Sequence, residues 1–161
     1  MTRYLVWPLA VILLVIAIFA LCLEPAKETE STELNLYQRH QYERWLWDLQ
    51  PLNLDWGLVA VAQERANDIA RTGEFTHYPS NGRDFTVIAT EYGVGFNRYW
   101  WLGENLASVP ASDDSYAVMV RWMNSPPHRA LIHAPQFSRM GIAEARTSDG
   151  WKYIVTIFAG Y

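Results

Sequence analysis

Apolar residues recur along this chain at helical spacing in the first two thirds and at strand spacing near the C-terminus. The first helix is predicted over residues 35–50, where four apolar residues fall at positions i, i+3, i+4 and i+7. These residues, which we expect on the buried face of the helix, are Tyr42, Trp45, Leu46 and Leu49. Pro51 follows and ends the helix, because proline lacks the N–H that another turn would need.

Three further helices are predicted downstream, each beginning after a residue that can cap its N-terminus. Asp55, Asp84 and Ser112 are the predicted caps, because their side-chain oxygens accept hydrogen bonds from the first free N–H groups. Gly73 and Gly93 end the second and third of the four predicted helices. The residues expected on the buried faces are Leu58, Ala62, Ala66 and Ile69, then Phe85, Ile88, Ala89 and Tyr92, and finally Tyr116, Met119, Val120 and Met123.

The C-terminal segment changes to a period of two. Residues 151–161 alternate in this way and predict a strand, and Ile154 and Phe158 on its second face indicate that both sides are covered. Residues 139–145 form another predicted strand, and the Ser-Asp-Gly turn at 148–150 joins the two as a hairpin. Helices followed by such a hairpin predict the α+β class, with helices packed over a sheet.

The N-terminus predicts a membrane anchor. Residues 4–23 are uncharged and apolar, and a helix of about twenty such residues crosses a bilayer. Arg3 precedes this run and acidic residues follow it, so the short N-terminus is expected in the cytoplasm and the remainder outside. A cleaved signal peptide is the alternative, although its apolar region is usually only about 7–15 residues. The chain therefore divides into an anchor or uncleaved signal at 1–23, a linker at 24–33 and one domain at 34–161.

Composition narrows the class of protein. Half of the residues are hydrophobic, and eight are tryptophans, which we expect mostly in the core. The net charge of −4 and the lack of clustered basic residues predict no nucleic-acid partner. Cys22 is the one cysteine in the sequence, so an intramolecular disulfide is excluded, and cysteine usage does not set the compartment.

Candidate chemistry rests on two histidines and one glutamate. His77, Glu104 and His128 are expected in three separate loops, whereas His40 lies in a predicted helix and is interpreted as structural or surface. Two imidazoles and a carboxylate can hold a catalytic zinc ion with water in the fourth position, or act as general acid and base. The spacing of these three residues is by itself weak evidence for a shared site, because no HExxH motif places two ligands on one helix face.

Glu104 lies in an apolar run, and a carboxylate there is unfavourable unless another group pairs with it. Three roles stay open from the residues alone: a structural acceptor of hydrogen bonds, a catalytic or metal-binding group, or a solvent-facing charge. Ser125 lies three residues before His128, but this proximity in sequence is no evidence for a serine hydrolase, which needs a base oriented in space.

Several motifs in order resemble the CAP superfamily, which comprises cysteine-rich secretory proteins, antigen 5 and plant pathogenesis-related proteins and is also called the SCP domain. The two strongest are GENLA at 103–107 and WMNSPPHRALI at 122–132, and they are most similar to the compact bacterial branch. An F-x-H segment ending at His77 precedes them, and two strand-like segments, MGIAEA and YIVTIFAG, follow. The resemblance covers residues 35–161.

The resemblance implies an α-β-α sandwich with a largely antiparallel central sheet. It also implies a cleft that holds two histidines and two glutamates, with a divalent metal in some members. His77, Glu104 and His128 match three of these four, while Asn124 and Ser125 stand where the second glutamate would fall. The resemblance therefore implies cleft residues His77, Glu104, Asn105, Ser125 and His128, and it supports a zinc ion only weakly, at His77, Glu104 and His128.

Two functions follow as hypotheses. The first is a ligand-binding or interaction module of the bacterial envelope, anchored in the inner membrane through residues 4–23 as a single-pass protein or secreted after cleavage. Its ligand would be a small molecule, a lipid or a protein. The alternative is a metal-assisted peptidase that uses His77 and His128 as ligands or bases and Glu104 as a base. The incomplete metal set favours the non-enzymatic hypothesis, and a scaffold without a small ligand is a third option.

Overall fold

A computed structural model describes residues 31–161, which form one compact unit. The anchor predicted at 4–23 and all but the end of the linker predicted at 24–33 lie outside the described residues. Among the helices of the described part, none is both long enough and apolar enough to cross a membrane.

A mixed four-stranded sheet forms the centre of the unit, with strand order β1-β3-β4-β2. The strands are β1 (Asn53–Leu54), β2 (Trp101–Pro110), β3 (Arg139–Arg146) and β4 (Trp151–Gly160). β4 pairs antiparallel with both β2 and β3, which makes it a central strand, and the short β1 pairs parallel with the start of β3. The prediction of a largely antiparallel sheet is therefore confirmed.

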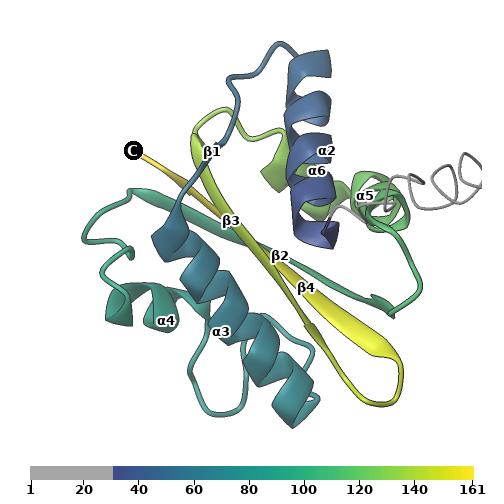
Figure 1. Cartoon of the computed structure of the whole chain (residues 1–161). Coiled ribbons are helices and arrows are strands. Elements are labelled where there is room, and N and C mark those ends of the chain that lie inside the picture. The colour runs from purple at the N-terminus through teal and green to yellow at the C-terminus, as the bar shows by residue number, and fades with distance from the viewer. Residues whose placement is uncertain (1–30) are drawn as a thin grey trace, which may run out of the picture. The chain divides into compact units, whose positions relative to one another are not determined.

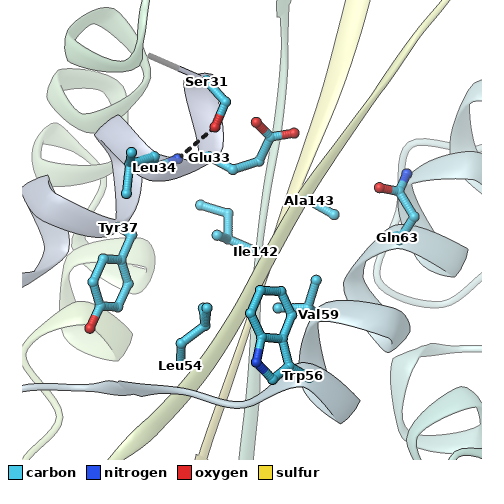
Figure 2. Close-up of a pocket in the computed structure, with 10 residues that line it drawn as sticks. All are labelled: Ser31, Glu33, Leu34, Tyr37, Leu54, Trp56, Val59, Gln63, Ile142 and Ala143. Atoms are coloured by element: carbon cyan, nitrogen blue, oxygen red, sulfur yellow. Dashed lines mark hydrogen bonds between the residues drawn. The ribbon is translucent and has the colours of Figure 1, made fainter.

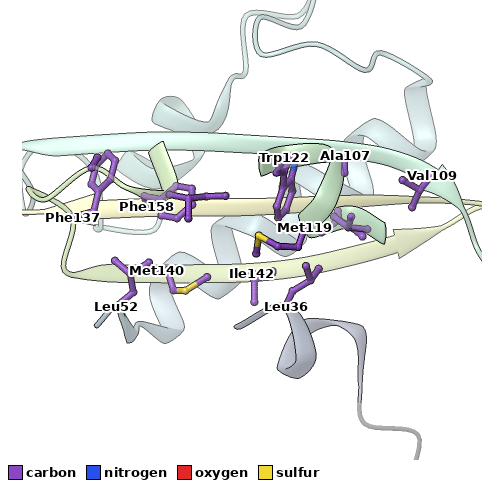
Figure 3. Packing of buried hydrophobic residues seen from close by; sticks show 14 residues of the cluster. Leu36, Leu52, Ala107, Val109, Met119, Trp122, Phe137, Met140, Ile142 and Phe158 are labelled. Atoms are coloured by element: carbon purple, nitrogen blue, oxygen red, sulfur yellow. The ribbon is translucent and has the colours of Figure 1, made fainter. Parts of the chain in front are cut away.

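Helices cover both faces of this sheet (Figure 1). On one face lie α3 (Trp56–Thr72) and α4 (Phe85–Glu91), and on the other lie α2 (Thr32–Leu46), α5 (Ser115–Asn124) and α6 (Pro126–Ile132). Figure 3 shows how Leu36 of α2 and Trp122 of α5 reach the same core as Ile142 and Phe158. A second core forms on the other face around α3. The predicted α+β sandwich is confirmed.

The close packing of α3 on β3 depends on Gly141. A Cβ atom at this position would lie 2.1 Å from the carbonyl carbon of Leu58, well inside van der Waals contact. The first turn of α3 therefore lies directly on the backbone of β3, and this fixes the direction in which α3 crosses the sheet.

The predicted N-terminal helix forms, but its predicted buried face is wrong. Tyr42, Trp45 and Leu46 are all more than half exposed, whereas Leu36, His40 and Arg44 are fully buried. The buried residues follow a spacing of four, but two of them are polar, so a pattern of apolar residues does not detect them. His40 packs between aromatic rings in the core, which confirms a structural role.

Backbone carbonyl groups explain why Arg44 is buried. Its guanidinium donates to four of them, at distances of 2.7 to 3.0 Å, from the segments that follow α2 and α6. These acceptors belong to Gln50, Ile132, Ala134 and Phe137. A buried charge that is fully hydrogen-bonded is tolerated where an unpaired one is not.

Two of the three predicted caps are confirmed. Asp55 and Asp84 each accept hydrogen bonds from the first N–H groups of α3 and α4. The cap predicted at Ser112 is wrong, because α5 begins two residues later than expected and Asp114 caps it. The buried face of α5 is formed by Ser115, Val118, Met119 and Trp122, so Tyr116, predicted to face inward, is exposed.

Two strands, β1 and β2, were not predicted, and the tryptophans expected mostly in the core are mostly exposed. Residues 101–110 form β2, so Glu104 lies on a strand and not in a loop. Its five residues from 103 to 107 are buried without alternation, which is why no period of two marks it. Among the described tryptophans only Trp122 is buried, whereas Trp100 and Trp101 are exposed.

Candidate functional site

Two side chains contact the carboxylate of Glu104, the guanidinium of Arg65 and the imidazole of His77. Its side chain is 1% exposed, and Oε1 lies 3.3 Å from Nε of Arg65, which projects from α3. Oε2 accepts a hydrogen bond of 2.7 Å from Nδ1 of His77, which lies in the loop after α3. The carboxylate therefore has a partner on each oxygen, and the solvent-facing interpretation is excluded.

Arg65 is the functional residue that sequence reasoning missed. Its side chain is fully buried, and besides Glu104 it reaches the carboxylate of Asp68 at 3.9 Å and donates to the carbonyl of Thr76. The signal was available, because Arg65 lies seven residues after Leu58 on the inner face of α3. An arginine on a buried helix face requires an anion, and Glu104 was the carboxylate in an apolar run that required a cation.

The bond from Arg65 to Thr76 also positions His77, the next residue. His77 is 45% exposed, so only its Nδ1 side is fixed against Glu104. A neutral imidazole that donates from Nδ1 carries its lone pair on Nε2. Glu104 thus orients His77 and sets its tautomer, a role typical of a carboxylate behind a functional histidine.

His128 lies on α6 beside Ser125, which ends α5 and begins α6. Its Nδ1 lies 2.7 Å from the Ser125 hydroxyl oxygen. Burial lowers the pKa of His128 below its usual 6.5, so the neutral imidazole predominates at pH 7.

Asn105 connects the two halves of the site. It follows Glu104 on β2, and its Nδ2 donates to the backbone carbonyl of His128 at 3.1 Å. We call His77, Glu104, Asn105, Ser125 and His128, together with Arg65, the histidine–glutamate cluster. It consists of two hydrogen-bonded groups, one around Glu104 and one around His128, which are joined because Glu104 and Asn105 are consecutive residues of β2.

The cluster does not fit a zinc ion held by three protein ligands. Arg65 already places a positive charge against Glu104, and Ser125 stands where a second glutamate would fall. Among residues 31–161, no three or more His, Cys, Asp and Glu side chains group in a way that could hold a metal. The zinc that the sequence weakly predicted at His77, Glu104 and His128 gains no support from this arrangement.

A small cavity of about 180 Å³ adjoins the His128 side of the cluster. Phe75, Trp122, Ser125 and His128 are among the residues that line it. Pockets for drug-sized ligands usually enclose about 300–1,000 Å³. This cavity therefore suits a single side chain or a small group and not a large ligand enclosed on all sides.

Comparison with known families gives a match over most of the described unit. Residues 37–158 match the model of the CAP family, described as the cysteine-rich secretory protein family. The chain is 28% identical over 110 residues to YkwD of Bacillus subtilis (strain 168), which is described as uncharacterized. This similarity spans 68% of the present chain but only 40% of YkwD.

Solved structures of related fold include bacterial surface proteins. An outer surface protein from Borrelia burgdorferi superposes with a TM-score of 0.72 at 23% identity, over 83% of this chain and 95% of that protein. An extracellular SCP-domain protein from Bacillus anthracis superposes with a TM-score of 0.68 at 22% identity, over 81% of this chain and 40% of that one. At such identities the similarity establishes the fold alone.

Proposed function

Because this chain belongs to the cysteine-rich secretory protein (CAP) family, we propose that it is a membrane-tethered extracytoplasmic module that binds a ligand through the histidine–glutamate cluster. One observation carries the proposal: the carboxylate of Glu104 is 1% exposed, with Oε1 in an ion pair with Arg65 and Oε2 hydrogen-bonded to His77. A general base needs an oxygen that can reach a substrate proton. Glu104 instead acts as a fixed anion that presents His77 to a ligand.

The proposed location outside the cytoplasm draws on sequence and on relatives. Residues 4–23 have the length and apolarity of a membrane anchor, with the positive charge before them. Two relatives of the same fold are described as an outer surface protein and as an extracellular protein. We place the anchor in the bacterial inner membrane, with secretion after cleavage as the alternative. Mass spectrometry of the mature N-terminus distinguishes them, since a chain that starts after residue 20 would contradict the anchor.

The alternative function, a metal-assisted peptidase, is favoured by one observation only. The lowered pKa of His128 keeps its imidazole neutral near pH 7, as a ligand or a base must be. The arginine at Glu104 argues against it, because a cation 3.3 Å from the carboxylate competes with any metal.

A cross-linking experiment on the full chain tests the binding proposal. A photo-reactive benzoylphenylalanine replaces Phe75, which lines the cavity and is 47% exposed, or Val87, which is 40% exposed on α4 and serves as the control. In intact cells we expect adducts of discrete mass from position 75 and none from position 87. His128→Ala should abolish them.

Metal content and peptidase activity decide between the two functions. We expect less than stoichiometric zinc in the purified full chain and no hydrolysis of casein. One zinc ion per chain, together with hydrolysis that Glu104→Gln abolishes while the circular dichroism spectrum is unchanged, would establish the peptidase instead.

A further inference from the structure

A second and larger cavity lies on a different part of the domain, at the outer edge of β3 between α2 and α3 (Figure 2). It encloses about 530 Å³ and shares no residue with the histidine–glutamate cluster. We call it the edge slot and define it by Leu34 and Tyr37 of α2, Trp56 and Val59 of α3, and Ile142 and Ala143 of β3. Its volume is in the range of ligand-binding pockets.

The edge slot lies along the same edge of β3 as β1, beyond the two residues of β3 that pair with β1. β1 covers only the first two residues of β3, and the N–H groups of Asn53 and Asp55 donate to the carbonyls of Ser138 and Met140. At Asp55 the chain leaves the sheet edge and enters α3. Backbone groups two residues apart on a strand point to the same edge, so those of Ile142 and Glu144 also point outward into the slot.

The outward carbonyl of Glu144 accepts a hydrogen bond from a side chain in place of a neighbouring strand, whereas the outward backbone groups of Ile142 have no partner within residues 31–161. The side-chain amide of Gln63 donates to the carbonyl of Glu144 at 3.1 Å. Ile142 is only 4% exposed, yet within residues 31–161 no group pairs with its outward N–H and C=O. A buried main-chain donor and acceptor without partners is rare in folded proteins. The ligand that completes this site must therefore offer one acceptor and one donor at strand spacing.

We propose that the edge slot binds an extended peptide segment of a partner protein, which pairs with Ile142 as an added β-strand. Ile142 packs into the core on the α2 side and Ala143 into the core on the α3 side. The side chains of an added strand alternate in the same way, so one enters the wall of Leu34 and Tyr37 and the next the wall of Val59 and Trp56. This recognition mode uses main-chain hydrogen bonds for affinity and apolar walls for selectivity.

A carboxylate at the rim of the edge slot favours a peptide that carries a basic residue. Glu33 also lines the slot, and it lies beside the mouth at the first turn of α2. A lysine or arginine that follows the two apolar residues of the peptide would point to the same side as the first of them, toward α2 and this carboxylate. An acyl chain could fill the apolar walls, but it offers no partner to the backbone of Ile142. The inference goes beyond the function proposed for the histidine–glutamate cluster and does not depend on it.

The test uses the full chain in lipid nanodiscs and an array of capped pentapeptides. Each peptide has the form Ser-X-X-Lys-Ser, with X drawn from Val, Ile, Leu, Phe, Tyr and Trp. We expect a subset to bind and to slow amide hydrogen exchange in residues 139–146 by about tenfold, because the added strand protects the outward N–H groups. A failure of every peptide to bind would overturn the proposal, whether the slot is empty or already filled by another part of the chain.

Two controls separate strand addition from simple apolar binding. The best peptide, N-methylated at both X residues, keeps its side chains but loses its donors, and we expect about tenfold weaker binding, or about 1.4 kcal/mol. Leu34→Asp in the slot should weaken binding similarly, whereas Leu46→Asp, on the same helix and also about half exposed, should not. Equal binding of the methylated peptide, or displacement of the peptide by laurate without loss of exchange protection, would overturn strand pairing.

Discussion

Buried polar side chains determine much of this domain at the scale of single residues. His40, Arg44, Arg65, Glu104 and Asn105 are all within 5% of complete burial. An apolar periodicity does not register such residues, and this is why the inner face of α2 was predicted wrongly. The identity of the cluster could still be predicted, because His77, Glu104 and His128 lie in short motifs. The partner Arg65 lies outside those motifs and required the three-dimensional contact.

Glu104→Gln should destabilise the domain by about 3 kcal/mol, because it leaves the buried guanidinium of Arg65 with only the more distant carboxylate of Asp68. Urea unfolding of the full chain, followed by tryptophan fluorescence, measures this loss. Arg65→Met combined with Glu104→Gln should recover most of it, since an apolar side chain needs no counter-ion. His77→Gln should lose less than about 1 kcal/mol, because His77 is half exposed. Equal losses in both single variants would contradict this account.

His40 makes the stability of the domain sensitive to acid. Burial lowers the pKa of His40 to about 4 from 6.5, so the unfolded chain binds a proton more readily than the folded chain between these values. The contribution is fully present above pH 6.5 and is lost as the pH falls, by roughly 3 kcal/mol at pH 4.

Comparison of urea unfolding at pH 7 and pH 4 in His40→Leu measures this contribution. We expect the variant to lose clearly less stability over that interval than the natural chain. The stability of His40→Leu should still depend on pH to a smaller extent, because the pKa values of His128 and His133 are also lowered in the folded chain. The same pH dependence in both chains would show that His40 does not titrate as described.

At the scale of elements, local chemistry predicted the helices better than the strands. Asp55 and Asp84 were correct caps because capping needs only a side-chain oxygen and the next few N–H groups. The hairpin of β3 and β4 was also predicted, since alternation and a turn are local. β2 was not, because its identity as a strand comes from pairing with β4 and from helices on both faces.

Asp55→Ala should destabilise the domain by about 2 kcal/mol. Asp55 caps α3 and also accepts a 2.7 Å hydrogen bond from the hydroxyl of Tyr99, so two contributions of about 1 kcal/mol each are lost. Asp114→Ala removes a cap alone and should lose about 1 kcal/mol. Thermal unfolding of the two variants gives the comparison, and a loss for Asp55→Ala no larger than that for Asp114→Ala would exclude the role of Tyr99.

At the scale of the whole molecule, the surface is unusually rich in large aromatic side chains. Trp45, Trp47, Trp56, Trp100 and Trp101 are each more than half exposed. Composition alone predicted them in the core, because it cannot tell a tryptophan that fills a cavity from one that stands on the surface. Exposed aromatic residues are enriched at binding surfaces, which agrees with an interaction module.

Substitutions should distinguish the exposed tryptophans from the buried one by their effect on stability. Trp100→Ser should change the free energy of unfolding by no more than about 0.5 kcal/mol, since the side chain is 78% exposed. Trp122→Ser should lose about 3–5 kcal/mol, because it empties the core and removes the indole hydrogen bond to the carbonyl of Leu106. Urea unfolding measures both values, and a large loss for Trp100→Ser would contradict its surface position.

The contacts of Arg44 also bear on how the chain acquires its structure during synthesis. Three of the four carbonyl groups that surround this guanidinium lie 88, 90 and 93 residues further along the chain. Chains leave the ribosome from the N-terminus at about 5–20 residues per second. The helix that carries Arg44 therefore waits several seconds for its acceptors, and β4, which completes the sheet, comes later still. The domain consequently completes its fold only after β4 has left the ribosome.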